Sequence, residues 1–330
     1  MAQKRRTSKR RRSQKITIRL SVSQLVTMIV AVICLLVGVN LGWEDGKLVL
    51  PTWSELYDAF DLSTKPQGSE QLSDETQAIH FIDVGQGDAT LLQSGDTYCL
   101  VDAGESDSQE ALLAYLEEQG VEQLALVVMT HPHADHIGGM RAVLEQIPVE
   151  QVLLPVLDNA PYPTTRTFER VMETIEKKQI PTVVSEAGQT FSIGDGVLEV
   201  LLEGMETDNY NNLSQVLYYK APGLSAVLSG DAEADLEQLA LQNGAVKQAQ
   251  IFKAAHHGSN TSNTWEFLQS IQPEWIVISC GKDNSYGHPH REPMERYQKL
   301  GATILRTDQD GSVILAATEN GIESYTTNAA

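Results

Sequence analysis

Apolar and polar positions along the middle of the chain predict short strands interleaved with amphipathic helices. Apolar runs separated by glycine-containing turns predict three early strands, at 79–83, 89–93 and 97–101. Apolar positions at helical spacing predict a helix over 108–119, with Ser108 as a candidate cap and Gly120 as its end. The sequence therefore starts this region with an antiparallel group of strands, followed by a helix.

The rest of the region alternates more regularly between strands and helices. An apolar run at 124–129 predicts a buried strand, and the spacing after Gly139 predicts a helix over 140–147. Two packed sheets flanked by helices, an α/β (α+β) architecture, fit this order of elements. The remaining predicted strands are 151–154, 181–184, 197–202, 214–219, 225–228, 249–253, 275–279, 302–305 and 312–316, and the remaining helices are 164–178, 232–242, 261–270 and 292–300.

The N-terminal residues have a different pattern. Residues 1–19 contain nine Lys or Arg and no acid, and residues 25–41 are almost entirely apolar. About 20 apolar residues cross a bilayer, so we expect a transmembrane anchor within 20–43, although a cleaved signal peptide or a buried helix would also fit. Residues 1–19 would then be a cytoplasmic tail facing anionic lipid, 44–76 a linker, and 77–330 an extracellular domain on a single-pass cell-membrane protein.

Charge limits what the expected domain can bind. The tail holds nine of the chain's 24 basic residues and none of its 44 acidic ones, so residues 20–330 carry a net charge of −29. Such a body repels polyanions at long range, which argues against tight non-specific binding of nucleic acid. A polyanion could still contact the domain locally through bound metal ions.

The three cysteines do not form a disulfide framework. Cys34 lies in the apolar N-terminal segment, whereas Cys99 and Cys280 fall in predicted strands. Buried free thiols are the favoured interpretation, and a single Cys99–Cys280 bridge is the alternative.

The most informative stretch is His131-Pro-His133-Ala-Asp135-His136, which directly follows a predicted strand. Imidazoles and a carboxylate at this density suit Zn²⁺ or Mn²⁺, and their spacing can serve two adjacent ions. A polar loop with accidental histidines is the competing interpretation. Clustered His and Asp side chains after a strand favour a metal site.

Four other groups of candidate residues follow predicted strands in the same way. Asp102 and Asp231 each end an apolar run, although Asp102 would also fit an ordinary turn and Asp231 a helix cap. Because strand ends on one side of a sheet converge, these groups predict one pocket. The remaining two groups are His256-His257 and His288-Pro-His290.

These motifs resemble those of the metallo-β-lactamase fold superfamily, through residues 130–139. More narrowly, the chain is similar to the extracellular hydrolase domain of DNA-uptake competence channel proteins, in a stand-alone form. The narrower resemblance covers about 78–317, and we expect no multi-pass channel beside it. It rests on Phe81-Ile-Asp-Val-Gly-Gln-Gly-Asp-Ala89, Leu228-Ser-Gly-Asp231, His256-His-Gly-Ser259 and Tyr286-Gly-His-Pro-His290.

The resemblance implies an αββα four-layer sandwich with a centre for two divalent ions, two Zn²⁺ or alternatively Mn²⁺. His131 and His133 would hold the first ion, Asp135 and His136 the second, and Asp231 would bridge them. Either His256 or His257, with a slight preference for His257, would complete the second site. Asp102 would orient the metal loop rather than bind an ion.

The chain departs from the superfamily's usual pattern at one point. Many members supply a further first-site histidine between the motif helix and the bridging aspartate, but this chain has no histidine between Gly139 and Asp231. Asn211-Asn212-Leu-Ser214 occupies the corresponding stretch. Occupancy by a single ion, or a preference for Mn²⁺, is therefore an open alternative.

The function that the resemblance implies is metal-dependent hydrolysis. We expect a membrane-anchored extracellular phosphodiesterase or nuclease-like enzyme that acts on a phosphoester, with nucleic acid as one candidate substrate. Asp135 would orient the attacking water, and His288 and His290 would contact the leaving oxygen or the phosphate. The alternatives are hydrolysis of a lactone, thioester or β-lactam, and a non-catalytic competence or envelope accessory module.

Overall fold

A computed structural model describes residues 42–44, 47–49 and 76–328 of the chain. In the N-terminal unit the described part is an antiparallel pair of short strands, β1 (Gly42–Glu44) and β2 (Lys47–Val49). Asp-Gly separates the two strands in the sequence, and this dipeptide is typical of hairpin turns. These six residues lie where the predicted anchor at 20–43 meets the predicted linker at 44–76.

The rest of the predicted tail, anchor and linker lies outside the described residues, so the domain boundaries stay predictions. Among the helices that the structure describes, none combines the length and the apolar character needed to cross a bilayer.

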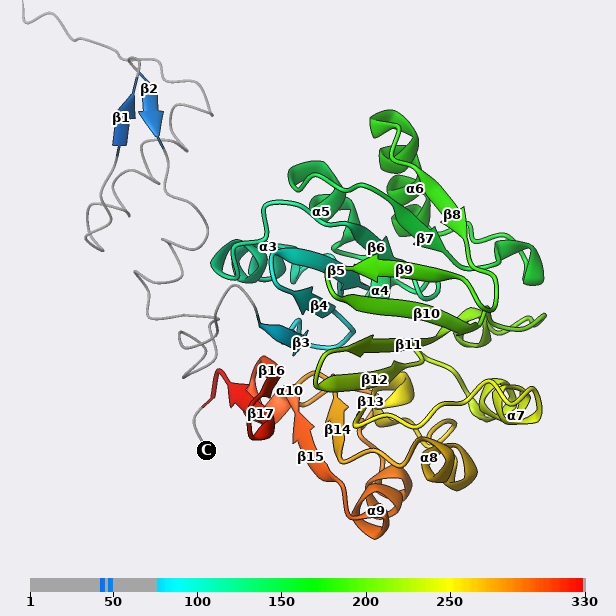
Figure 1. The fold of residues 1–330 in the computed structure, drawn as a ribbon. Coiled ribbons are helices and arrows are strands. Elements are labelled where there is room, and N and C mark those ends of the chain that lie inside the picture. The colour runs from blue at the N-terminus through cyan, green and yellow to red at the C-terminus, as the bar shows by residue number, and fades with distance from the viewer. Residues whose placement is uncertain (1–41, 45–46, 50–75, 329–330) are drawn as a thin grey trace, which may run out of the picture. The chain divides into compact units, whose positions relative to one another are not determined.

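The first large sheet of the second unit joins an antiparallel part to a parallel part (Figure 1). Strands β3 to β5 and β16 to β17 pair antiparallel, and β5 to β8 pair parallel. In spatial order the strands are β17 (Gly321–Thr326), β16 (Val313–Thr318), β3 (Gln77–Phe81), β4 (Thr90–Ser94), β5 (Thr97–Val101), β6 (Leu126–Val128), β7 (Val152–Leu154) and β8 (Thr182–Val184).

The second sheet has the same division. Strands β9 to β12 pair antiparallel, whereas β12 to β15 pair parallel. Its spatial order is β15 (Thr303–Arg306), β14 (Trp275–Ile278), β13 (Ile251–Lys253), β12 (Leu224–Leu228), β11 (Val216–Ala221), β10 (Gly196–Leu202) and β9 (Thr190–Ile193).

Alternating side chains place a separate apolar layer on each face of the sheets. Leu92 and Cys99 of the first sheet pack with Leu217 and Val277 of the second, so the central core lies between the sheets. Their sequence neighbours point the other way, because successive side chains of a strand alternate between its faces. Leu91 thus joins a core under α3 (Gln109–Glu118), α5 (Met140–Gln146) and α6 (Arg166–Lys178).

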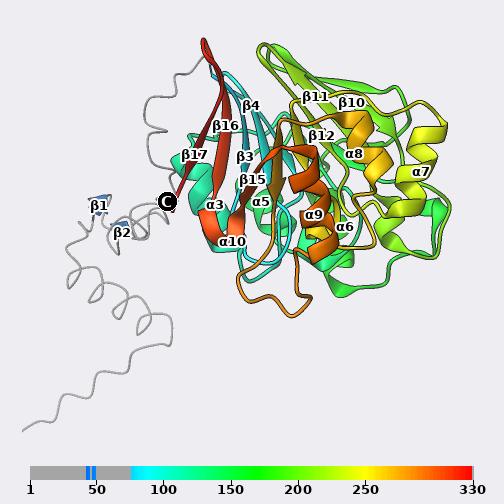
Figure 2. The ribbon, with the colours of Figure 1, turned by 90° about the horizontal axis from the view of Figure 1, so that it is seen from below.

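The outer face of the second sheet is covered in the same way by α7 (Ala234–Gln242), α8 (Trp265–Ile271) and α9 (Arg291–Leu300) (Figure 2). The layers therefore run helix, sheet, sheet, helix, as predicted. The shorter helical elements are α4 (Ala134–Ile137), α10 (Thr307–Asp310) and the 3₁₀ turns η2 (Leu157–Asn159), η3 (Tyr210–Leu213) and η4 (Ala255–Gly258).

The structure corrects the sequence prediction mainly at the edges of the sheets. Strands β9 and β17 were not predicted, and most of their side chains are at least partly exposed, so neither shows a continuous apolar run. Three helices start at least two residues later than predicted, α6 at 166, α7 at 234 and α8 at 265. Cys99 and Cys280 are both buried free thiols, which rules out the alternative of a bridge between them.

Candidate metal centre

The histidine motif occupies the turn from β6 into α4. His133 has an extended backbone and precedes the first residue of α4, so Asp135 and His136 fall on the helix itself. His131 and His136 are completely buried, whereas His133 is partly exposed. His131 Nε2 lies 3.0 Å from His133 Nδ1, which brings two imidazole nitrogens together at one point.

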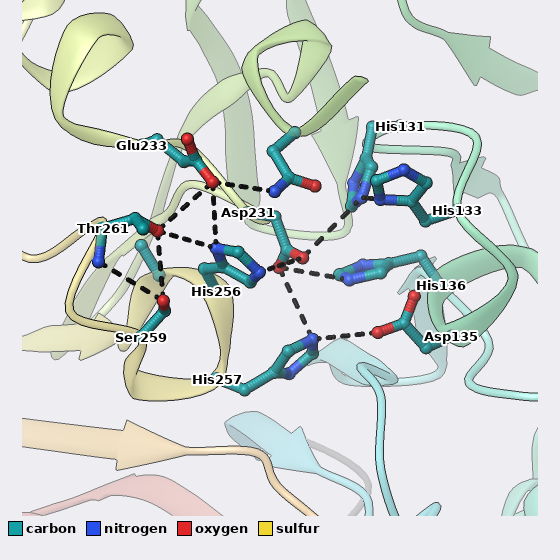
Figure 3. Close-up of polar contacts among 12 residues, drawn as sticks. His131, His133, Asp135, His136, Asp231, Glu233, His256, His257, Ser259 and Thr261 are labelled. Atoms are coloured by element: carbon teal, nitrogen blue, oxygen red, sulfur yellow. Dashed lines mark hydrogen bonds and ion pairs between the residues drawn. The ribbon is translucent and has the colours of Figure 1, made fainter. Parts of the chain in front are cut away.

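Asp231 stands at the centre of the cluster, three residues after the end of β12 (Figure 3). Its Oδ1 lies 3.1 Å from His136 Nε2 and 3.6 Å from His257 Nε2. Its Oδ2 lies 3.8 Å from His131 Nε2 and 3.7 Å from His256 Nε2. The two oxygens of one buried carboxylate therefore face different pairs of histidines.

Two overlapping groups of side chains could hold metal ions. In each group the possible ligand atoms all lie within 4.8 Å of one another. We call them the first group and the second group, and they share Asp231. The first group is His131, His133 and Asp231, and the second is Asp135, His136, Asp231 and His257.

The second group fits a divalent ion because it contains polar atoms without partners. His136 Nε2, His257 Nε2 and Asp231 Oδ1 are buried and lack a hydrogen bond of good geometry. Their nearest polar neighbours are one another and the Asp135 carboxylate, with His136 Nε2 3.1 Å from Asp231 Oδ1 and His257 Nε2 3.2 Å from Asp135 Oδ2. Buried polar atoms are normally satisfied, so unsatisfied nitrogens and an oxygen that converge need a ligand. Imidazole nitrogen and carboxylate oxygen are donors that Zn²⁺ and Mn²⁺ accept.

The outward-facing nitrogens of the second group are held in place. Asp102, after β5, accepts hydrogen bonds from His136 Nδ1 at 2.8 Å, from the Thr130 hydroxyl at 2.6 Å and from the Thr130 amide at 2.9 Å. His257 Nδ1 donates to the Ser279 carbonyl at 3.0 Å. Such contacts fix the ring orientation of metal-binding histidines and leave Nε2 free to bind.

Asp88, from the Phe81–Ala89 motif, forms a buried ion pair with Lys253, and neither residue was predicted to belong to the site. Lys253 Nζ lies 2.7 Å from Asp88 Oδ2, and Asp88 Oδ1 lies 3.5 Å from His257 Nδ1. Burial raises the pKa of Asp88, but the Lys253 ammonium and His257 outweigh it and hold this pKa below its usual range. A lysine at the end of an apolar strand is a usable signal, since lysines are rarely buried without a partner.

Asp88 reaches this position because a glycine precedes it. Gly87 has a φ of +135°, and a Cβ there would lie 2.2 Å from the Asp135 carbonyl oxygen. The close approach lets the Asp88 amide donate to that oxygen at 3.0 Å. The glycine-rich segment after β3 is thus fastened to the motif helix.

The two groups differ in their protonation. Burial lowers the pKa of His131 and His133, so both are neutral at pH 7. Burial also acts to lower the pKa of His136 and His257, but Asp231 in both cases, with Asp102 and Asp88, raises the pKa of His136 well above its usual value and that of His257 to about 10. Burial opposes ionisation of Asp231, yet His136 and His257 hold its pKa well below the usual range.

The centre opens into a pocket of about 330 Å³. His288 lines it with a buried Nδ1 that has no partner, and burial together with His257 and His256 lowers its pKa to about 4. His290 does not line it, and its Nδ1 accepts from the Asn260 amide at 3.0 Å. The other lining residues include the predicted His133, Asp135, Asp231, His256 and His257, and the unpredicted Gln86, Glu105, Ala134, Asn211 and Tyr286.

Comparison with known families decides the class of this fold. Residues 82–280 match the metallo-β-lactamase superfamily. The chain belongs to this superfamily. Its two-sheet fold is that of the superfamily's metal-dependent hydrolases, and the candidate ligands described above lie in it.

Within the superfamily, the chain is similar to proteins named for competence. The chain is 30% identical over 256 residues to ComE operon protein 3 of Bacillus subtilis, and this alignment covers 71% of this chain and 32% of the relative. It is 28% identical over 304 residues to Competence protein ComA of Neisseria gonorrhoeae, covering 91% of this chain and 39% of that protein. The chain thus spans about a third of the length of these relatives.

A solved structure supports the fold alone. The metallo-β-lactamase fold protein YhfI of Bacillus subtilis aligns with a TM-score of 0.50 at 12% sequence identity. The alignment covers 73% of this chain and 100% of YhfI. The resemblance to competence proteins that the motifs indicated is confirmed by the curated relatives.

Proposed function

We propose that the metallo-β-lactamase domain is a phosphodiesterase that uses two divalent ions, Zn²⁺ or Mn²⁺. The observation that carries this proposal is Asp231, whose two oxygens face separate groups of metal-binding side chains at 3.1–3.8 Å. A pair of ions sharing one carboxylate suits displacement at phosphorus, because it stabilises both the attacking and the leaving oxygen. The names of the competence-protein relatives specify no reaction.

The chain's own residues supply the ligands and position the substrate. His131 and His133 would hold one ion, and Asp135, His136 and His257 the other, with Asp231 shared. Divalent ions bound there supply Lewis acidity and make a water molecule more acidic. Asp135, part of the pocket wall, would hold the second ion and orient a water molecule through a hydrogen bond to its carboxylate.

His288 contributes a hydrogen bond rather than a proton. With its pKa lowered to about 4, its ring is neutral at pH 7, so it cannot act as an imidazolium acid. Its unpartnered Nδ1 and its place in the pocket wall suit a contact with a phosphate or leaving-group oxygen. His290, which lies outside the pocket lining, is assigned no contact with the substrate.

The pocket's surroundings favour a short phosphodiester over a long polyanion. A neighbouring cavity of about 760 Å³ shares Gln86 and Glu105 with the metal pocket. Asp83, Asp107 and Asp308 also line this cavity, and Lys282 is the basic residue in its wall. A nucleic-acid strand would meet repulsion there, so we propose a small or cell-envelope phosphodiester as the substrate.

A substrate panel tests the reaction class. The full chain, purified with a mild detergent, is stripped of metal, reloaded with Zn²⁺ or Mn²⁺, and assayed with bis-(p-nitrophenyl) phosphate, single-stranded DNA, nitrocefin and a thioester. We expect hydrolysis of the phosphodiester, lost in His133→Ala and Asp135→Ala but kept in Glu292→Gln, an exposed carboxylate on α9. Hydrolysis of nitrocefin or the thioester alone would contradict the proposal, as would equal activity in all variants.

We also propose that the domain is held outside the cell membrane by the apolar segment at 25–41, with the basic tail in the cytoplasm. The support is the sequence pattern of residues 1–43. Protease added to intact cells should release the domain into the medium, and full protection would refute the outward placement.

A further inference from the structure

The neighbouring histidines His256 and His257 face different oxygens of Asp231. His257 Nε2 lies 3.6 Å from Oδ1, on the side of His136, whereas His256 Nε2 lies 3.7 Å from Oδ2, on the side of His131 (Figure 3). His256 and His257 therefore do not compete for the same metal position. Each histidine points at a different half of the shared carboxylate.

The backbone that produces this arrangement is unusual. His256 and His257 both adopt left-handed conformations, with φ of 50° and 55°. Such conformations are unfavourable for a residue other than glycine because its Cβ comes too close to the following carbonyl oxygen. The His256 amide donates to the Gly230 carbonyl at 3.1 Å, which ties this turn to the residue before Asp231. Strain of this kind concentrates where side-chain placement serves a site.

The far nitrogen of His256 is held as a metal ligand's would be. Its Nδ1 lies 3.2 Å from the Thr261 hydroxyl and 3.4 Å from Glu233 Oε1, and the Thr261 hydroxyl donates to the same Glu233 oxygen at 3.2 Å. A carboxylate behind Nδ1 directs the proton to that nitrogen and leaves Nε2 with its lone pair toward Asp231. Asp102 does the same for His136.

Glu233 is itself fixed by the segment that stands where a first-site histidine is missing. Asn209 Nδ2 donates to Glu233 Oε2 at 2.9 Å, and Asn211 Nδ2 donates to Oε1 at 3.0 Å. The Glu233 amide donates to Asn212 Oδ1 at 2.9 Å. Asn209, Asn211 and Asn212 thus hold the carboxylate behind His256.

We propose that His256 is the third protein side chain of the first metal site, beside His131 and His133, with Asp231 shared, and that Glu233 is its positioning residue. This inference rests on the proposed pair of ions. It replaces the missing histidine with one from the turn after β13, which lies outside the tight first group and approaches Asp231 from the opposite side of the pocket. The first ion then has a complete ligand set.

Counting ions in paired variants tests the assignment. Metal-free full chain, purified with mild detergent, is titrated with Co²⁺, followed by visible absorption and by metal content after dialysis. We expect two ions in the wild type and one in His133→Ala, in His256→Ala and in His257→Ala. His133→Ala/His256→Ala should still keep one, because both changes remove the same ion, whereas His256→Ala/His257→Ala should keep none.

Two outcomes separate His256 from other roles. Retention of two ions with wild-type affinity in His256→Ala would overturn the proposal, and so would one retained ion in His256→Ala/His257→Ala. A wild type that binds fewer than two ions would also overturn it. Two bound ions without phosphodiesterase activity would overturn the proposed function and leave the ligand assignment standing.

A milder variant, which keeps every histidine ligand, separates the loss of a metal contact from a failure to fold. Glu233→Gln should weaken the first ion by about 10- to 100-fold and leave the second unchanged, since removing an orienting carboxylate typically costs that much affinity. Glu292→Gln, a matched change at an exposed position, should leave both ions unchanged. Equal affinities in Glu233→Gln and wild type would remove Glu233 from its positioning role.

Discussion

The two halves of the centre share Asp231 but balance charge differently. Around Oδ1, His136 and His257 have raised pKa values and are surrounded by the carboxylates Asp102, Asp88 and Asp135. Around Oδ2, His131 has a lowered pKa and its Nδ1 lies 3.1 Å from the Thr130 hydroxyl, a neutral partner. One half is thus a network of opposite charges, and the other is a set of neutral rings.

A metal ion therefore competes with protons to a different extent in the two halves. In the second group an incoming cation must displace protons, whereas in the first group it meets imidazoles that are already free. In the second group, carboxylates fix the orientation of the histidine rings. The first group has only two histidines of its own and, in our proposal, needs His256 as a third. Four measurements test whether the two halves differ in this way.

The largest effect is expected from the residue common to both halves. Asp231→Asn should lower kcat/KM for bis-(p-nitrophenyl) phosphate by at least about 10³-fold, or about 4 kcal/mol, because both ions lose a ligand. Metal content should fall in step. Retention of one tightly bound ion would mean that Asp231 serves a single half.

The pH dependence of metal binding separates the halves next. Between pH 6 and 8, affinity for the second ion should rise by about 100-fold per pH unit, because His136 and His257 carry protons in the metal-free protein that binding must release. Affinity for the first ion should change little in that range, since His131 and His133 are neutral. Competition with a chelator at three pH values measures both slopes, and equal slopes would contradict the comparison.

The same shift predicts the stability of the metal-free protein. The raised pKa of His257 contributes stability that is fully present below the unfolded value near 6.5 and is lost as pH rises through about 10. The melting temperature in a chelator should therefore fall between pH 7 and 10. A melting temperature that rises over this range would show that His257 is not stabilised in its charged form.

A smaller effect is expected from the carboxylate behind His136. Asp102→Asn keeps an acceptor for the Thr130 amide but loses the charge, and it should weaken the second ion by about 10- to 100-fold. The first ion should keep its affinity, and Glu292→Gln, a change at an exposed position on α9, is the control. A weakening of both ions would show that Asp102 supports the whole centre.

The sequence predicted the parts of the centre that depend on short-range order. A buried strand followed by closely spaced histidines placed His131 to His136 together, and apolar runs ending in Asp231 and His257 located further candidates. The four-layer arrangement followed because each strand alternates its apolar faces and each helix has one apolar side. Edge strands such as β17 escaped prediction because exposure on one side removes the apolar run that marks a buried strand.

Tertiary structure alone decided which atoms meet. The contact of Lys253 with Asp88 spans 165 positions of sequence, and that of Glu233 with His256 crosses from one strand end to another. No local pattern encodes such distances, because they depend on the register and order of the strands in each sheet. Residue types and their spacing therefore determined that this protein could bind metal and hydrolyse a bond. The folded arrangement decided how the ligands divide around Asp231, since only packing fixes which oxygen each histidine faces.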